Sequence, residues 1–242
     1  RRWWRRRNMH APHVLDWRVP GSVWAMDFSQ APSRIDGRER HLLAVRDLAS
    51  GKTLHWAPVE SPDAGAVIAA LRSLFVEHGA PLVLKTDNGS PFGAASTREF
   101  LEQSGVANLF SPAHTPRYNG AIEASIGSLK TRTERFAQAR GRPGCWSADD
   151  LAAAVLEADC TARPQGIYGP TPQELWNGRM PISKLTDVRL AMGSTLVAIQ
   201  EKQAAKLRLE SFGFVFQMPR MVKNLTILDN ILLPSLTYKK DK

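Results

Sequence analysis

The chain contains only two cysteines among its 242 residues. Cys145 and Cys160 stand in no CxxC arrangement, which excludes a zinc site built from cysteines, and no disulfide framework is expected. No run approaches the roughly 18 apolar residues of a membrane span. The arginine-rich start is not followed by an apolar stretch, so it is not a signal peptide. These absences predict a protein of a reducing cytoplasm with no membrane partner.

A phosphate-binding loop and an initiating methionine are also absent. No GxxxxGK[ST] motif occurs in the chain, which excludes ATP binding through that loop. The chain begins with Arg1, so we expect an incomplete reading frame. Apolar residues are abundant: the 43% hydrophobic content is ample for a buried core and excludes a disordered protein. The length fits one good-sized domain plus extras, or two small domains.

The excess positive charge is confined to the two ends. The formal net charge of +9 invites a nucleic-acid interpretation. Residues 1–20 carry six arginines and one aspartate, and residues 195–242 carry eight basic and four acidic side chains. Residues 21–194 hold 18 of each sign and are neutral. We interpret residues 1–20 as a basic linker or the remnant of an upstream DNA-binding domain, and a solvated linker fits equally well.

The hydrophobic patterns of the central region change between those of strands and those of helices. Strands are predicted at residues 23–30, 40–48, 52–60, 82–87 and 107–111, and helices at 61–79 (capped by Ser61 or Asp63), 96–104, 118–140, 148–162 and 171–176. Short links between the first three strands suggest an antiparallel meander. The element order predicts an α/β fold with a mixed five-stranded sheet flanked by helices.

Two aspartates occupy positions that suggest a function. Asp27 lies in the middle of the first strand among apolar neighbours, where a buried charge needs a partner or a metal. An aspartate at a strand edge facing water is an equally good interpretation. Asp87 ends the buried strand, and ligands of open α/β sheets gather at the carboxyl ends of strands. The alternative is an ordinary Asx turn, since Asp-Asn-Gly is favourable turn sequence.

Glu123 lies in the first turn of the long helix predicted at residues 118–140. It is one step, about 100° of helix rotation, from the apolar stripe, and therefore borders the core. Lys130 follows seven residues later on the same face. A solvated amphipathic helix, whose glutamate interacts with the helix dipole, fits these residues as well. The arginines that follow could equally be solvated or contact DNA.

Together these carboxylates could serve phosphodiester chemistry. Cleavage and strand transfer use two Mg²⁺ ions about 3.5–4 Å apart, one activating the nucleophile and one holding the leaving oxygen. Mg²⁺ takes oxygen ligands, keeps several waters, and binds few carboxylates plus substrate phosphate. A mid-strand aspartate, an aspartate at the end of the adjacent strand and a helix glutamate beside them could supply that set.

Three segments resemble the signature blocks of one enzyme family. They are WAMDFS (24–29), KTDNGSPF (85–92) and SPAHTPRYNGAIEASIGSLK (111–130). In order and spacing they resemble the retroviral-integrase-type DDE transposases of bacterial insertion sequences. That family requires 35 residues between its last Asp and Glu, as found here between Asp87 and Glu123, and a basic residue seven after the Glu. The resemblance covers about residues 20–180 and implies an RNase H-like fold.

The resemblance also implies roles for single residues. Asp27, Asp87 and Glu123 would be the catalytic carboxylates and the ligands of two Mg²⁺ or Mn²⁺ ions. The implied reaction is in-line attack of water or a 3′-hydroxyl on a DNA phosphate, without a covalent protein–DNA intermediate. Lys130 would contact the end of the DNA element. Further residues that would line the site or touch DNA are Asn88, His114, Arg117, Tyr118 and Asn119.

Some of these assignments have alternatives. His114 could equally be a turn residue, and Tyr118 a packing residue at the helix start. The implied partners are the element ends and target DNA, together with further copies of the chain, because such enzymes usually act as multimers. The expected location is the bacterial cytoplasm, in association with the nucleoid, and no ATP is expected to bind.

The resemblance divides the chain into three parts. Residues 21–182 would be the integrase catalytic core, preceded by the basic stretch at residues 1–20. Residues 183–242 would hold a junction and a tail that resembles the segment around the glutamine loop of ABC-transporter ATPases, with Gln217 as its glutamine. An element inserted into a transporter gene would give such a fusion. A fragment this short should not form an independent domain, so residues from about 195 onward should be loosely packed or depend on the core for order.

Four functions compete. The leading prediction is a DDE polynucleotidyl transferase that cleaves and joins DNA. The first alternative is a catalytically incompetent remnant that only binds DNA. An ABC-ATPase subunit would explain only the tail and fails for lack of a phosphate loop. A general RNase H-like nuclease is a further alternative, although Lys130 and the Asp–Glu spacing favour the integrase type.

Overall fold

The structure, a computed structural model, describes residues 17–111, 119–180 and 182. The chain divides into two units, and all described residues belong to the unit that spans Asp16–Val197. Most of the basic N-terminal stretch and the whole of the predicted tail lie outside the described residues. The expectations for those two segments therefore stay predictions.

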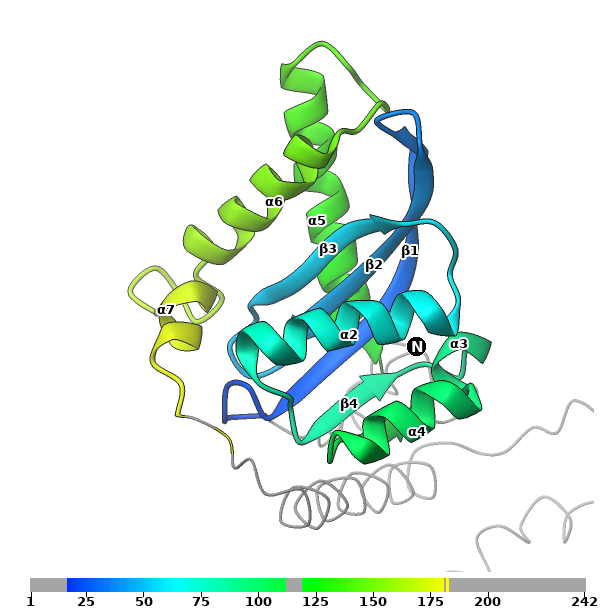
Figure 1. The fold of residues 1–242 in the computed structure, drawn as a ribbon. Coiled ribbons are helices and arrows are strands. Elements are labelled where there is room, and N and C mark those ends of the chain that lie inside the picture. The colour runs from blue at the N-terminus through cyan, green and yellow to red at the C-terminus, as the bar shows by residue number, and fades with distance from the viewer. Residues whose placement is uncertain (1–16, 112–118, 181, 183–242) are drawn as a thin grey trace, which may run out of the picture. The chain divides into compact units, whose positions relative to one another are not determined.

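A mixed five-stranded sheet forms the centre of the described unit (Figure 1). In spatial order its strands are β3 Thr53–Val59, β2 Glu39–Asp47, β1 Val23–Ile35, β4 Val83–Thr86 and β5 Ala107–Phe110. β1, β2 and β3 form the predicted antiparallel meander, whereas β4 pairs in parallel with β1, and β5 with β4. The predicted sheet is therefore confirmed.

Helices cover both faces of the sheet. In the described ranges they are α2 Ala64–His78, α3 Ser90–Gly93, α4 Ala95–Gln103, α5 Gly120–Ala139, α6 Ala148–Cys160 and α7 Pro172–Asn177. Figure 1 shows α2 and α4 on one face, and α5 and α6 on the other. The N-cap of α2 is Asp63, whose carboxylate accepts from the N–H of Ala66 at 2.9 Å. No helix of the described residues is long and apolar enough to cross a membrane.

The alternation of side chains along β1 builds a separate core on each face. Trp24 and Met26 are buried in the core beneath α2 and α4, where Trp24 packs against Phe75. Ala25 lies in the opposite core, together with Ile122 of α5. Burial of a large apolar side chain contributes about 1.5–3 kcal/mol, so β1 is held firmly from both sides. Every second side chain of β1, counted from Ala25, must therefore lie on the face covered by α5.

Two local features differ from the prediction. β1 continues past its predicted end at Gln30, through Pro32 to Ile35. Its pairing with β2 shifts register between Gln30 and Ile35, and this irregularity accommodates a proline that cannot donate to the ladder. The sequence pattern also does not predict α3, because four residues are too few to show a helical period.

Candidate active site

Asp27 lies in β1 on the face that α5 covers. Its partner in β2 is Ala44, which belongs to the same core as Ala25. The side chain is half-buried, and Oδ1 accepts a hydrogen bond from the backbone N–H of Phe28 at 2.8 Å. β1 is a central strand with β2 and β4 on either side. Asp27 therefore lies within a central strand of the sheet, and its functional role stays a prediction.

Asp87 follows directly after β4, at the carboxyl end of that strand. β4 pairs in parallel with β1, with Lys85 opposite Ala25. Continued by two residues, this register brings Asp87 level with Asp27, on the same face of the sheet. Asp87 Oδ1 accepts from the backbone N–H of Gly89 at 2.8 Å. The Asx turn is thus present, and it fixes the carboxylate at the end of the strand.

Gly89 allows this turn to close on the carboxylate. A Cβ at Gly89 would lie 2.9 Å from Oδ1 of Asp87, which is too close without a shift of one of them. Phe92 of α3 is buried and stacks on Phe28, with ring centroids 5.3 Å apart. The chain after β4 is therefore packed against β1. A carboxylate supported in this way is preorganised to bind a ligand.

Glu123 lies in the first turn of α5, as predicted. Its side chain is exposed, whereas its neighbour Ile122 is buried in the core beneath the helix. The predicted apolar stripe is confirmed at Ile126, Leu129 and Thr133, which are also buried, whereas its last member, Phe136, is half-buried. Glu123 thus borders the core on the same face of the sheet as the two aspartates, at a position that solvent can reach.

The three carboxylates interact electrostatically. Burial, the charge of Asp87 and, as a smaller cause, the charge of Glu123 raise the pKa of Asp27 from 3.8 to about 6, although the hydrogen bond from Phe28 lowers it. Burial and like charges both raise the pKa of a carboxyl group because they disfavour its ionised form. Asp87 and Glu123 are therefore within electrostatic range of Asp27, and we refer to the three side chains as the acidic cluster.

The donor atoms of this cluster suit a divalent cation. In the part of the chain that the structure describes, no three His, Cys, Asp or Glu side chains form a group that could hold a metal ion by themselves. Mg²⁺ does not need such a cage, because it keeps several waters and binds through one or two carboxylates plus substrate phosphates. The Oδ2 atoms of Asp27 and Asp87 accept no hydrogen bond from a described residue. A cation there would offset the repulsion within the cluster.

The residues predicted to contact DNA have more varied positions. Three of them lie outside the described residues: His114, Arg117 and Tyr118. Asn88 Nδ2 donates to the carbonyl of Ser111 at 2.8 Å, which ties the turn after β4 to the end of β5. Asn119, the N-cap of α5, is buried, and its side-chain oxygen has no donor among the described residues. Lys130 is half-buried in α5. Their DNA contacts stay predictions.

Lys85 lies on the same face of the sheet as Asp27 and is not among the residues that the sequence identified. It is 7% exposed and lies beside Ala25, on the face of the sheet that carries Asp27. Burial lowers the pKa of Lys85 to about 8, because desolvation disfavours the charged form. Counting back two residues from Asp87 would have placed it on this face. The strand β4 gave no reason to single out Lys85, because all four of its residues are buried and polar side chains do not alternate with apolar ones along it.

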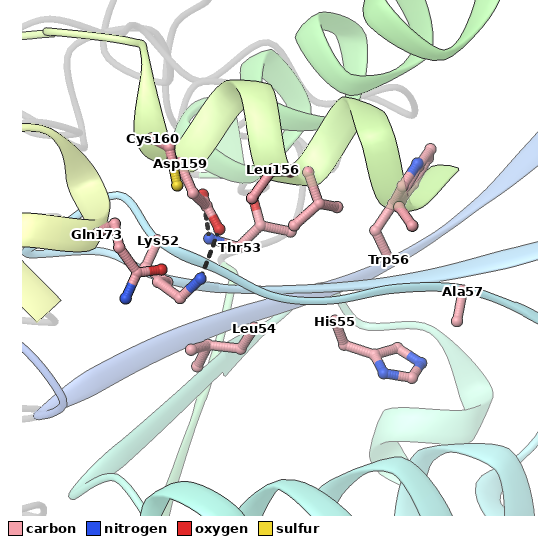
Figure 2. Close-up of a pocket in the computed structure, with 12 residues that line it drawn as sticks. Lys52, Thr53, Leu54, His55, Trp56, Ala57, Leu156, Asp159, Cys160 and Gln173 are labelled. Atoms are coloured by element: carbon pink, nitrogen blue, oxygen red, sulfur yellow. Dashed lines mark hydrogen bonds and ion pairs between the residues drawn. The ribbon is translucent and has the colours of Figure 1, made fainter. Parts of the chain in front are cut away.

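A cavity of about 410 Å³ between β3, α6 and α7 is a separate feature, and none of the three carboxylates lines it. Asp159, which is 1% exposed, accepts from Lys52 Nζ at 2.7 Å and from the N–H of Thr53 at 3.0 Å (Figure 2). Both of its carboxylate oxygens therefore bind α6 to the edge strand β3. The charged residues of this cavity have a structural role.

Comparison with known families places these residues in context. The sequence profile of the family described as "Integrase core domain" matches residues 18–116, which include Asp27 and Asp87. The Gag-Pol polyprotein of woolly monkey sarcoma virus is 30% identical over 167 residues, which are 67% of this chain and 9% of the polyprotein. The chain spans between 9% and 14% of the length of the first polyproteins that it matches.

Solved structures share the fold. The simian T-cell lymphotropic virus intasome, in complex with PP2A regulatory subunit B56 gamma, contains a chain with a TM-score of 0.61 and 16% identity, over 72% of this chain and 61% of that one. The HTLV-2 integrase catalytic core domain in complex with magnesium has a TM-score of 0.53 and 17% identity, over 65% of this chain and 97% of that one. The described residues therefore have the RNase H-like fold of integrase catalytic cores. The relatives that it matches in sequence include retroviral polyproteins.

Proposed function

We propose that this chain holds the catalytic core of a DDE transposase or integrase, which cleaves DNA phosphodiester bonds and transfers the DNA strand. The observation that carries the proposal is that Asp27, Asp87 and Glu123 lie on one face of an RNase H-like sheet, where burial and, after it, the charges of Asp87 and Glu123 raise the pKa of Asp27. Such repulsion does not stabilise a fold, and perturbed carboxylates of this kind concentrate at functional sites.

A different element of the fold positions each of the three carboxylates. Asp27 presents its oxygen from a rigid central strand, and Asp87 from a turn that Gly89 closes. Glu123 approaches from the exposed first turn of α5. Together they hold two Mg²⁺ or Mn²⁺ ions, which when bound activate the nucleophile and stabilise the leaving oxygen.

The rest of the reaction depends on the placement of DNA. Lys130 neutralises a phosphate of the DNA end, with Asn88, His114, Arg117, Tyr118 and Asn119 as further contacts. Water or a 3′-hydroxyl attacks the phosphorus in line with the leaving oxygen. No residue of the chain becomes covalently attached to DNA.

The partners and the origin of the chain belong to the same proposal. The substrates are the element ends and target DNA, and the chain assembles with further copies of itself. The HTLV-2 integrase core domain, known in dimeric and trimeric forms, supports the assembly. The order of the motifs within residues 21–182 supports an origin in a bacterial insertion sequence, acting at the nucleoid. The glutamine-loop resemblance supports an ABC-ATPase fragment without ATP binding in residues 183–242.

Nicking and strand transfer of labelled DNA by the full chain, in Mg²⁺ or Mn²⁺, test the proposal. Asp87→Asn should abolish the products because it removes a metal ligand. Asp149→Asn makes the same change at an exposed position of α6 and should retain them. Equal product from Asp87→Asn and the wild type would refute the assignment. A wild-type chain that is folded by circular dichroism and binds DNA without any product would be a remnant that only binds DNA.

A further inference from the structure

An open groove of about 730 Å³ lies between α5 and the hairpin of β1 and β2. Side chains of α5 between Lys130 and Gln138 form one wall. Residues 30–32 of β1 and Arg40 of β2 form the other, and Trp146 also lines the groove. None of the three carboxylates lines it, so the catalytic cluster alone does not explain its chemistry.

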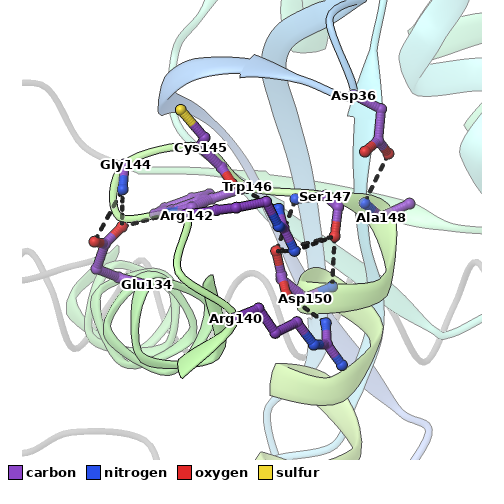
Figure 3. A network of polar contacts seen from close by, with 10 residues as sticks. All are labelled: Asp36, Glu134, Arg140, Arg142, Gly144, Cys145, Trp146, Ser147, Ala148 and Asp150. Carbon is purple, nitrogen blue, oxygen red and sulfur yellow. Dashed lines mark hydrogen bonds and ion pairs between the residues drawn. The ribbon is translucent and has the colours of Figure 1, made fainter. Parts of the chain in front are cut away.

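Basic side chains outnumber acidic ones along this groove. Arg40, Lys130 and Arg135 line it together with a single acidic residue, Glu134. Figure 3 shows the Glu134 carboxylate turned toward the loop after α5, where Trp146 Nε1 donates to it at 2.6 Å. This hydrogen bond is the main cause that lowers the pKa of Glu134. The Glu134 carboxylate therefore accepts hydrogen bonds from donors within the protein.

Arg40 and Lys130 line the groove without an acidic partner, since neither forms an ion pair with a residue in the described ranges. Arg135, in contrast, pairs with Glu157 of α6. Arg40 Nε donates to the carbonyl of Ala31 at 2.9 Å, which holds the guanidinium against the hairpin. Its two terminal nitrogens remain to donate to a ligand. A planar guanidinium fixed in this way matches a phosphate with two hydrogen bonds and loses little freedom on binding.

The groove follows the carboxylate cluster along α5. Lys130 comes seven residues after Glu123, which is about 10 Å along the axis of a helix that rises 1.5 Å per residue. Successive phosphates of a B-DNA strand advance about 3.4 Å along the duplex axis. A duplex that passes over the carboxylates with its axis along α5 therefore reaches the groove within about three nucleotides.

We propose that this groove binds the sugar-phosphate backbone of DNA about three nucleotides from the reacting phosphate, with Arg40 as a phosphate contact opposite Lys130. The inference deepens the proposed function and rests on it, because the carboxylates set the position of the DNA. The contact is independent of base sequence, since a phosphate carries no sequence information. Its effect is to hold the strand in register with the catalytic cluster.

Equilibrium binding of duplex DNA by the full chain at several salt concentrations tests this contact. Each phosphate contact contributes about 0.9 to the slope of log K against log salt. Arg40→Gln should lower the slope by about one contact, and Arg40→Lys should retain most of it because the charge remains. Arg38→Gln removes the same charge from an exposed position of the same hairpin outside the groove, and should leave the slope unchanged.

The outcomes separate this proposal from the catalytic one. Equal slopes for the wild type and Arg40→Gln, or equal losses in Arg40→Gln and Arg38→Gln, would overturn the groove contact. The binding series is run in an Asp87→Asn background, so that the DNA stays intact, and strand transfer is measured on wild-type protein in parallel. A loss of slope confined to Arg40→Gln supports the groove, even where the wild type forms no product and the catalytic proposal fails.

Discussion

Replacement of Asp27 by asparagine is predicted to stabilise the folded protein when no divalent cation is present. Folding raises the pKa of Asp27 from 3.8 to about 6, through burial and the charges of Asp87 and Glu123. Asparagine is the matched replacement, because its side-chain oxygen can still accept the hydrogen bond from the N–H of Phe28. The variant therefore loses the charge and keeps the local geometry.

The sign and size of the effect follow from the pKa of Asp27 in the two states. A raised carboxyl pKa means that the folded state binds the proton more tightly than the unfolded chain does. Below about pH 4 both states are protonated and the group does not change stability. Stability falls as the pH rises from about 4 to about 6, and above that the whole penalty is present. Two pKa units correspond to about 3 kcal/mol, which screening at a half-buried site reduces to about 1–2 kcal/mol.

Urea denaturation at about pH 7.5 and about pH 4, with and without Mg²⁺, measures this penalty. Asp27→Asn should be the more stable protein at the higher pH, and the difference should be much smaller at the lower one. Mg²⁺ should stabilise the wild type and narrow the difference, because an ion that binds only the native state adds to its stability. A variant less stable than the wild type at the higher pH without cations would refute the reasoning.

Two further substitutions test the support of the site and of the fold. Gly89→Ala should reduce strand transfer on the order of ten- to a hundred-fold, because its Cβ displaces the carboxylate that the turn fixes, whereas Gly93→Ala meets no atom within 4 Å. Equal activity of these two variants would contradict the account of the turn. Asp150→Ala should lower the free energy of unfolding by about 2 kcal/mol, because it loses the capping box with Ser147 and the ion pairs with Arg140 and Arg142. The exposed Asp149→Ala should change it by less than about 1 kcal/mol in the same urea titration.

The sheet could be predicted because each strand and turn carries its own local signal. Asp36 and Gly37 both adopt positive φ, 49° and 74°, between β1 and β2, and Asp-Gly is the sequence that such a hairpin turn favours. The acidic cluster could be predicted from motif order and spacing, since Asp87 marks a strand end and Glu123 a helix start. Local sequence defines both of these positions.

Features that depend on pairing between distant segments could not be predicted. Arg40 and Lys130 lie on opposite walls of one groove although 89 residues separate them in the chain. Counting residues places Lys85 on the face of Asp87, but its position opposite Ala25 depends on the register between β4 and β1. The extension of β1 beyond Gln30 likewise depends on a register shift against β2. Periodicity describes one segment at a time and carries no such register.

Glu123 is the most direct test of the central claim, because it lies beyond the residues 18–116 that match the integrase core domain family. The measurement is strand transfer by the full chain as Mg²⁺ or Mn²⁺ is titrated, comparing wild type, Glu123→Gln and the exposed control Glu102→Gln of α4. The account predicts cation-dependent product from the wild type and from Glu102→Gln, and none from Glu123→Gln. Product from Glu123→Gln at the wild-type level and with the same cation dependence would contradict a catalytic site built from these three carboxylates.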